Sequence, residues 1–345
     1  METLADTIAV LGAGSWGMAL AKLFCNAGRR VQLWEYLPDR AIKLARERRD
    51  DAFLRGLILP TQVQITSDLE AALRDADLVA LVLPSHAMRE VCTELNAIGL
   101  ARTTLVSMSK GLENETLMRM SEVILDAVDE ELENQVAVLS GPSHAEEVSV
   151  GLPTTVVVAS SQPDVARYVQ RSLMTGTFRI YTNPDVIGVE MGGALKNIIA
   201  IAAGVCDGLG FGDNTKAALL TRGLAEISRL GVAMGANPLT FAGLSGMGDL
   251  IVTCTSRHSR NRNLGEHIGK GATLEEAMQQ TVMVAEGVKT TAAAYDLAQR
   301  VGVEMPITEK VRAVLFGGEE PRAAVSALME RSARSEFEAD FLSSR

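Results

Sequence analysis

The chain of 345 residues is long enough for about two domains, each with a hydrophobic core of its own. Its 33 Lys and Arg residues against 43 Asp and Glu residues give a formal net charge of −10, which repels phosphate backbones and anionic lipid surfaces, so neither nucleic acid nor stable membrane association is expected. Hydrophobic residues at 47% and charged residues at 22% are typical of a folded globular protein and exclude a disordered chain.

The first half of the chain alternates short aliphatic or β-branched runs with stretches whose apolar residues recur at helical spacing. Strands are predicted at residues 7–12, 30–35, 63–65, 78–83, 103–107 and 136–140, and helices at residues 16–28, 39–48, 68–73, 87–96 and 115–129. Ser67 and Asn114 are expected to cap the third and fifth of these helices. Strand followed by helix, repeated, predicts a doubly wound parallel sheet with helices on both faces.

Two further strands, at residues 154–159 and 178–181, flank a predicted helix at 163–173 and are expected to extend the same sheet. From about residue 185 the pattern changes to helices alone, with long examples predicted at 189–205, 216–234, 273–280 and 290–301. We therefore predict an α/β domain over residues 1–184 and an all-α domain over residues 185–345, with a frayed polar tail at 335–345.

The cysteines and the N-terminal region indicate a cytoplasmic protein. Cys25, Cys92, Cys206 and Cys254 lie far apart, without the paired spacing of metal ligands, so they are expected to be reduced and buried, and no metal site is predicted. The uncharged stretch at residues 7–21 contains three glycines and lacks the basic region of a signal peptide.

A glycine-rich segment, Gly12-Ala13-Gly14-Ser15-Trp16-Gly17, follows the first predicted strand and opens the first predicted helix. Glycines at these positions allow a tight turn, close approach of the backbone to a pyrophosphate and close helix–strand packing, while the helix N-terminus attracts the phosphates. In this context the segment predicts a Rossmann-type dinucleotide-binding domain. A plain turn without a ligand is the alternative.

Glu35 ends the second predicted strand, where a carboxylate binds the ribose hydroxyls of a dinucleotide. A 2′-phosphate would meet a like charge there, so Glu35 favours NAD over NADP. Arg40 is the nearest cation, but it falls in the next predicted helix rather than beside the strand end. A solvated carboxylate that points away from the ribose is the alternative.

Six segments carry a resemblance to a known family. They are residues 12–17, 109–113 (SKGLE), 139–147 (LSGPSHAEE), 194–197 (ALKN), 244–250 (LSGMGDL) and 259–262 (SRNR). In this order they resemble the bacterial NAD(P)-dependent glycerol-3-phosphate dehydrogenases, from Ile8 to about Leu315. The resemblance implies reversible interconversion of dihydroxyacetone phosphate and sn-glycerol 3-phosphate for glycerophospholipid synthesis, and a homodimer.

Reduction of a ketone places negative charge on the carbonyl oxygen, so the site must supply a proton or a positive donor. Lys196 falls in an otherwise apolar predicted helix, where burial would lower the pKa of its amine. The resemblance makes it the general acid and base; a snorkelling surface lysine is the alternative. Lys110 follows a strand at the ligand-binding edge of the sheet, and the resemblance implies that it contacts substrate and cofactor, whereas the alternative is a solvated loop lysine.

The resemblance also assigns the polar residues of the later segments. Asp249 orients Lys196 or a substrate hydroxyl, the alternative being an N-cap of the next helix. Arg260 and Asn261 grip the substrate phosphate, and a local cluster of three arginines would steer an anion in this acidic chain. Ser143 offers its hydroxyl to the glycerol oxygens or only caps a helix. The resemblance assigns no role to His144.

The predicted site comprises three groups of residues. The catalytic residues are Lys196, Lys110 and Asp249; the substrate-binding residues are Lys110, Gly141, Ser143, Lys196, Asp249, Ser259, Arg260 and Asn261; the cofactor-binding residues are Gly12, Gly14, Ser15, Trp16, Gly17, Glu35, Lys110, Ala145, Arg260, Val284 and Glu286. Two alternatives stay open from the residues alone: a ketopantoate-type or other 2-ketoacid reductase of the same fold, and a dinucleotide-binding regulator without turnover.

Overall fold

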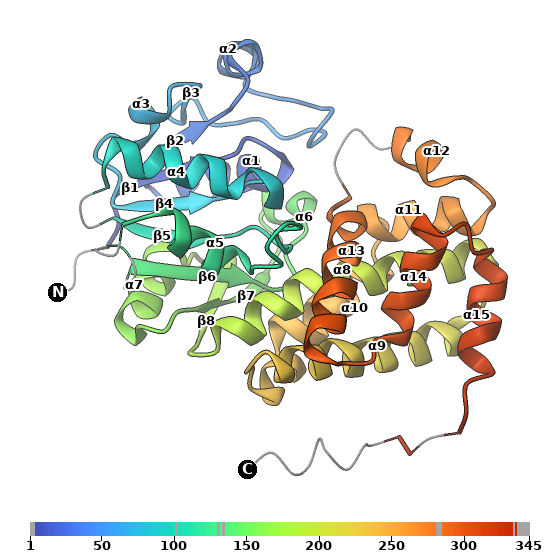
Figure 1. The fold of residues 1–345 in the computed structure, drawn as a ribbon. Helices are drawn as coiled ribbons and strands as arrows, with labels where there is room; N and C mark the ends of the chain where they lie inside the picture. The colour runs from blue at the N-terminus through green and yellow to red at the C-terminus, as the bar shows by residue number, and fades with distance from the viewer. Residues whose placement is uncertain are drawn as a thin grey trace.

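Two domains, one built around a β-sheet and one entirely helical, lie side by side (Figure 1). The computed structural model describes residues 4–100, 103–129, 132, 135–280, 285–333 and 335–336. The predicted combination of a Rossmann-type domain and an all-α domain is confirmed. Of the predicted frayed tail, residues 337–345 lie outside the described residues.

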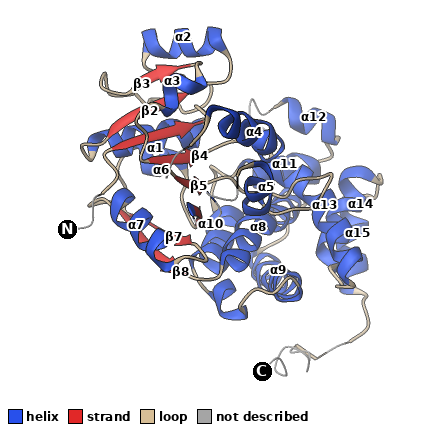
Figure 2. Cartoon of the chain, turned by 60° about the vertical axis from the view of Figure 1, so that its left-hand side comes forward, coloured by secondary structure: helices blue, strands red, loops and turns tan. Residues whose placement is uncertain are grey.

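An eight-stranded sheet forms the centre of the first domain (Figure 2). Its spatial order is β3-β2-β1-β4-β5-β6-β7-β8, so the chain reverses its direction of progress across the sheet between β1 and β4, the switch point at which such folds bind ligands. The strands are β1 (Thr7–Leu11), β2 (Arg30–Trp34), β3 (Gln64–Thr66), β4 (Leu78–Leu81), β5 (Thr104–Ser107), β6 (Val136–Ser140), β7 (Thr154–Ala159) and β8 (Phe178–Asn183).

The predicted parallel sheet is confirmed except for one pair of strands. β7 and β8 do extend the sheet, but β7 pairs antiparallel with β6, with Leu139 opposite Val158. Between these strands the chain forms only the short helix α6 (Ala145–Ser149). A parallel pair needs a longer crossover, which carries the chain back to the end of the sheet where the first strand began. The short connection here leaves the chain at the end where β6 finishes, so β7 runs back antiparallel to β6.

Alternate side chains of the central strands pack into two hydrophobic layers. Ile8 and Val10 join one layer, which also contains residues of α1 (Ser15–Asn26), α2 (Pro38–Glu47), α6 and α7 (Pro163–Leu173). Ala9 and Leu11 join the other, with residues of α3 (Leu69–Leu73), α4 (Met88–Ile98) and α5 (Met120–Ala127). Because successive strand side chains point to opposite faces, this division places helices on both faces of the sheet, as predicted.

Two predicted helix caps differ from those in the structure. Asp68, rather than Ser67, caps α3, since its side chain accepts a hydrogen bond from the backbone N–H of Ala71 at 3.1 Å. Asn114 caps no helix, because α5 begins only at Met120. Leu117 has a left-handed backbone with φ of 64°, which a continuous right-handed helix from residue 115 could not contain.

The second domain is organised around α8 (Val186–Gly208). An 18-residue window of α8 has a mean hydropathy of 1.5, enough for a membrane span, but 78% of that window is buried inside the protein, so α8 is a core helix. A Cβ at Gly204 would lie 1.9 Å from the carbonyl oxygen of Arg262, so glycine lets α11 pack closely on α8. The other helices are α9 (Asp213–Ala233), α10 (Asp249–Thr255), α11 (Arg260–Gly269), α12 (Leu274–Gln279), α13 (Glu286–Val301), α14 (Pro306–Phe316) and α15 (Pro321–Met329).

The four cysteines are free thiols. Cys92, Cys206 and Cys254 are buried, as predicted, whereas Cys25 is only partly buried.

Candidate active site

The glycine-rich turn between β1 and α1 has the geometry that a dinucleotide requires. Gly12 has a φ of 112°, and a Cβ there would lie 2.4 Å from the carbonyl oxygen of Val82. A Cβ at Gly17 would lie 1.8 Å from the carbonyl oxygen of Gly12, so glycine is needed for the helix to pack on the turn. Gly14, the N-cap of α1, has nothing within 4 Å of its Cβ position. This open side at the helix N-terminus fits a bound pyrophosphate.

Glu35 directly follows β2 and is only 6% exposed. One carboxylate oxygen accepts a hydrogen bond from the backbone N–H of Leu37 at 3.0 Å, and the other is paired with Arg40. Arg40 also donates to the carbonyl oxygen of Ala13 in the glycine-rich turn at 2.7 Å and to Asp50 at 2.9 Å. The prediction that Arg40 lies away from the strand end is therefore wrong, since its guanidinium connects Glu35 to that turn.

Lys110, Asp249 and Lys196 form one ion cluster between the two domains. Lys110 follows β5, while Asp249 begins α10 and Lys196 lies in the middle of α8. The Nζ of Lys110 is 2.6 Å from one carboxylate oxygen of Asp249, and the Nζ of Lys196 donates to the other. Thr253 accepts a second hydrogen bond from Lys196 at 2.7 Å. Three segments that are far apart in sequence thus place two amines on either side of one carboxylate.

Burial decides the electrostatics of this cluster. Lys196 is 6% exposed and Asp249 only 1%. Burial lowers the pKa of Lys196 from 10.5 to about 7, against the opposing effect of the Asp249 charge. For Asp249, burial alone would raise the pKa, but the charges of Lys110 and Lys196 outweigh it and hold the pKa below its usual range. A carboxylate that stays ionised therefore lies beside an amine that titrates near neutrality.

These contacts decide between the alternatives left open for two residues. Lys196 does not snorkel to the surface, because its amine is buried. Asp249 does not cap α10: its carboxylate bonds the two lysines, and the residue at the N-cap position is Gly248.

The turn that follows β6 lies against the same cluster. Gly141 has a φ of 132°, and its carbonyl oxygen accepts hydrogen bonds from the Nζ of Lys110 at 3.1 Å and from the Oγ of Ser143 at 3.0 Å. α6 begins at Ala145, with His144 at the N-cap position, so Ser143 does not cap a helix. The bond to Gly141 holds Lys110 against this turn through contacts within the protein itself.

Polar side chains at the start of α11 already form hydrogen bonds within the protein. Ser259 caps α11 by accepting from the backbone N–H of Arg262 at 3.2 Å. The buried amide of Asn261 donates to Asn197 at 3.0 Å and accepts from the backbone N–H of Gly287 at 3.0 Å. These bonds fix the start of α11 on α8 and α13.

The three arginines of this segment do not act as one steering patch. Arg262 forms an ion pair with Asp207 at 2.6 Å, so its charge is balanced within the helical domain. Arg257 lies beside His258. Arg260, the first residue of α11, is exposed.

Sequence reasoning missed two contributors to the site. Thr253 lies four residues after Asp249, on the same face of α10, a spacing that could have revealed it. Ser85 follows β4, and its Oγ donates to the Oε2 of Glu286, at the start of α13, at 2.9 Å. This bond joins the two domains beside the sheet edge, and no local pattern signals it. Of the predicted cofactor residues, Val284 lies outside the described residues.

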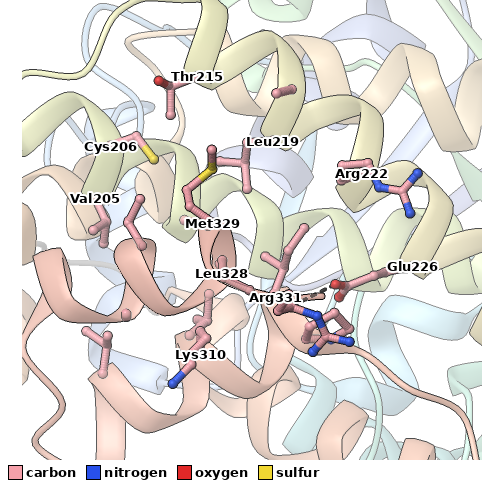
Figure 3. A pocket seen from close by; sticks show the side chains of 18 of the residues that line it. Val205, Cys206, Thr215, Leu219, Arg222, Glu226, Lys310, Leu328, Met329 and Arg331 are labelled. Atoms are coloured by element: carbon pink, nitrogen blue, oxygen red, sulfur yellow. Dashed lines mark hydrogen bonds between the residues drawn. The ribbon is translucent and has the colours of Figure 1, made fainter. Parts of the chain in front are cut away.

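A cavity of about 790 Å³ lies in the helical domain, away from this cluster (Figure 3). Its walls come from α8, α9, α14, α15 and the segment after α15, and are mainly apolar, as at Leu219, Val311 and Leu328. The lysines and the aspartate of the cluster are not among its lining residues.

A dinucleotide turn at the switch point of the sheet, with a buried lysine supplied by a helical domain, defines a two-domain NAD(P)-dependent dehydrogenase. The chain belongs to the NAD-dependent glycerol-3-phosphate dehydrogenase family: the model of the family's N-terminal domain matches residues 7–166 and that of its C-terminal domain matches residues 185–326. The resemblance carried by the six sequence segments is thereby confirmed.

Individual relatives agree with this assignment over the full chain. A protein of Moorella thermoacetica named glycerol-3-phosphate dehydrogenase (NAD(P)+) is 55% identical over 333 residues, which cover 96% of this chain and 98% of that one. The crystal structure of glycerol-3-phosphate dehydrogenase from Coxiella burnetii superposes with a TM-score of 0.90 at 39% identity, covering 94% of this chain and 99% of that one.

A ketopantoate reductase structure from Ralstonia eutropha is 14% identical, with a TM-score of 0.56, and covers 94% of this chain and 100% of that one. At this identity the similarity shows a shared fold only.

Proposed function

We propose that this NAD(P)-dependent oxidoreductase interconverts dihydroxyacetone phosphate and sn-glycerol 3-phosphate. The observation that carries the proposal is the buried cluster of Lys110, Asp249 and Lys196 between the dinucleotide-binding domain and the helical domain. Family membership decides against the two alternatives, because the ketopantoate-type reductases share only the fold, and because the relatives that match along the full chain are named as dehydrogenases.

The cofactor, when bound, supplies a hydride to the carbonyl carbon. The residues that would hold it are those of the glycine-rich turn, namely Gly12, Gly14, Ser15, Trp16 and Gly17, together with Glu35, Lys110, Ala145, Arg260, Val284 and Glu286. The open side of Gly14 at the start of α1 fits its pyrophosphate.

Lys196 is the proposed general acid and base. Its pKa of about 7 lets a substantial fraction of the amine carry a proton at neutral pH, ready for the oxygen that becomes an alkoxide. In the reverse direction the neutral amine accepts the proton of the secondary alcohol. Asp249 and Thr253 fix the orientation of Nζ through two hydrogen bonds, so the proton is held at one place in the site.

Lys110 is proposed to stabilise the same developing charge and to contact both substrate and cofactor. Its amine is bound to Gly141 and Asp249, which holds it next to the turn where Ser143 offers a hydroxyl to the glycerol oxygens. At the other end of the substrate, the proposed phosphate site consists of Ser259, Arg260 and Asn261. Arg260 is exposed there and supplies a planar group that matches phosphate oxygens.

For the cofactor preference, we propose that NADH is favoured by a small factor. Glu35 lies at the carboxyl end of β2, where a 2′-phosphate would meet its negative charge. The ion pair with Arg40 weakens this repulsion, because a guanidinium already bound to Ala13 lies beside the same carboxylate. Substantial use of NADPH is therefore expected as well.

The remaining proposals concern the assembly and its setting. The division of the chain at residues 184 and 185 is supported by the position of β8 before it and α8 after it. A homodimer, a cytoplasmic location and a role in glycerophospholipid synthesis are proposed from membership of the family.

The test of the proposed function is the oxidation of NADH and NADPH by the purified protein when dihydroxyacetone phosphate is added, with ketopantoate and unphosphorylated dihydroxyacetone as comparison substrates. Efficient turnover of dihydroxyacetone phosphate alone supports the proposal. Preferential turnover of ketopantoate, or none with any ketone, contradicts it.

A further inference from the structure

His144 lies at the boundary between the two domains and takes no part in the mechanism above. It is the N-cap residue of α6, between Ser143 and Ala145, and its side chain is partly buried. Its Nε2 atom is buried without a hydrogen-bond partner among the described residues. A polar atom in this state is uncommon in folded proteins and calls for an explanation.

The imidazole of His144 reaches two segments of the helical domain. Its ring centroid is 6.1 Å from that of His258, with the ring planes inclined by 55°. It also forms a hydrogen bond with the backbone of Val252 in α10. Val252 precedes Thr253, which binds the amine of Lys196, and His258 precedes Ser259, the cap of α11. One side chain of the first domain therefore contacts both α10, which carries Asp249 and Thr253, and the residues just before α11, where the proposed phosphate site begins.

The surroundings of His144 favour its neutral form. Burial lowers the pKa of the imidazole, and the nearby charges of Lys196 and Lys110 lower it further, against the opposing effects of Val252 and Glu146. A charged ring would place a third cation beside two lysines that share one carboxylate.

We infer that His144 is a positioning residue, which fixes residues 256–259, and with them the phosphate-binding end of α11, against the turn at residues 141–145. The inference rests on the proposed function, because it assumes that the start of α11 binds the substrate phosphate. His144 acts through the ring of His258 and touches neither the reacting atoms nor the phosphate. Loss of the ring contact leaves Lys196 in place but lets the phosphate site move relative to it.

A double-mutant cycle on kcat/KM tests this coupling with His144→Ala, His258→Ala and the double variant. Each single change is expected to lower kcat/KM for dihydroxyacetone phosphate by about tenfold through KM, and the double change by no more than the larger single effect, because the two residues share one contact. With unphosphorylated dihydroxyacetone His258→Ala should retain the wild-type kcat/KM, whereas His144→Ala and the double variant, which also lose the bond to Val252, should lose clearly less than they do with dihydroxyacetone phosphate. His267→Ala, in the last turn of α11, is the matched control and should have no effect.

Effects that multiply in the double variant, or equal losses with both ketones, would overturn the inference. A wild-type protein that does not reduce dihydroxyacetone phosphate would instead reject the proposed function, so the two failures are distinct. If His144→Ala does not fold, His144→Leu takes its place in the same cycle, since it fills the space without a ring, and the same outcomes decide.

Discussion

Replacement of Lys196 by Met should abolish most of the activity and at the same time stabilise the protein. Lys196 is 6% exposed, and its pKa is lowered from 10.5 to about 7, so the fold opposes the charged form of the amine. One pKa unit corresponds to about 1.4 kcal/mol, and the burial of this lysine therefore lowers the free energy of unfolding by about 5 kcal/mol at and below pH 7.

The change of this destabilisation with pH follows from the number of protons that the folded and the unfolded protein bind. Between pH 7 and pH 10.5 the unfolded chain holds a proton on Lys196 that the folded protein has released, so the destabilisation shrinks as the pH rises and vanishes above 10.5. Methionine keeps the apolar stem and removes the amine. The hydrogen bonds lost at Asp249 and Thr253 offset part of the gain, by about 1–3 kcal/mol. A net stabilisation of about 2–4 kcal/mol is expected at pH 7.

Urea denaturation followed by circular dichroism, at several pH values between 7 and 10.5, measures this difference for the wild type and the Lys196→Met variant. The stability advantage of the variant should be largest at pH 7 and should decline with rising pH. A variant that is less stable than the wild type by the same amount at every pH would refute the reasoning, because Lys196 would then behave as an ordinary charged lysine.

Three further predictions concern substrate, cofactor and domain contacts. Arg260→Ala should lower kcat/KM for dihydroxyacetone phosphate by a factor that corresponds to the loss of about 2–4 kcal/mol of transition-state binding. An equal loss of kcat/KM with unphosphorylated dihydroxyacetone would show that Arg260 does not recognise the phosphate. Glu35→Ser should raise the ratio of kcat/KM for NADPH to kcat/KM for NADH, and Arg40→Ala should lower that ratio. If the ratio is unchanged in both variants, Glu35 and Arg40 do not face the ribose. Ser85→Ala removes the 2.9 Å bond to Glu286, a proposed cofactor-binding residue, and should raise KM for the cofactor about threefold to tenfold with kcat unchanged; an unchanged KM would show that this bond does not support cofactor binding by Glu286.

Much of the fold could be predicted because its signals are local. The central strands are runs of aliphatic residues, and the turn at Gly12 has glycines where the backbone admits no Cβ. The antiparallel pairing of β7 with β6 has no such signal, since it depends on where a short connection leaves the chain in space. The sequence does not decide which residue caps α3, because the neighbouring Ser67 and Asp68 are both good capping residues.

The sequence predicts most of the residues that form the site, but it does not predict which of them contact one another. Asp249 is 139 residues from Lys110 and 53 from Lys196, so only the tertiary fold brings the three together. The reach of Arg40 back to Glu35 depends on how closely α2 follows β2, which a helical pattern alone does not define. Ser85 and Glu286, 201 residues apart, meet only because the helical domain packs against the sheet edge.

The central claim is that Lys196 transfers the proton during ketone reduction, and the kcat of Lys196→Ala at saturating NADH and dihydroxyacetone phosphate tests it most directly. The account predicts a kcat lower by about 10²–10³-fold, the scale for loss of a donor to developing oxyanion charge, with NADH affinity nearly unchanged by fluorescence titration. A variant that keeps more than about a third of the wild-type kcat, far above that range, would contradict it.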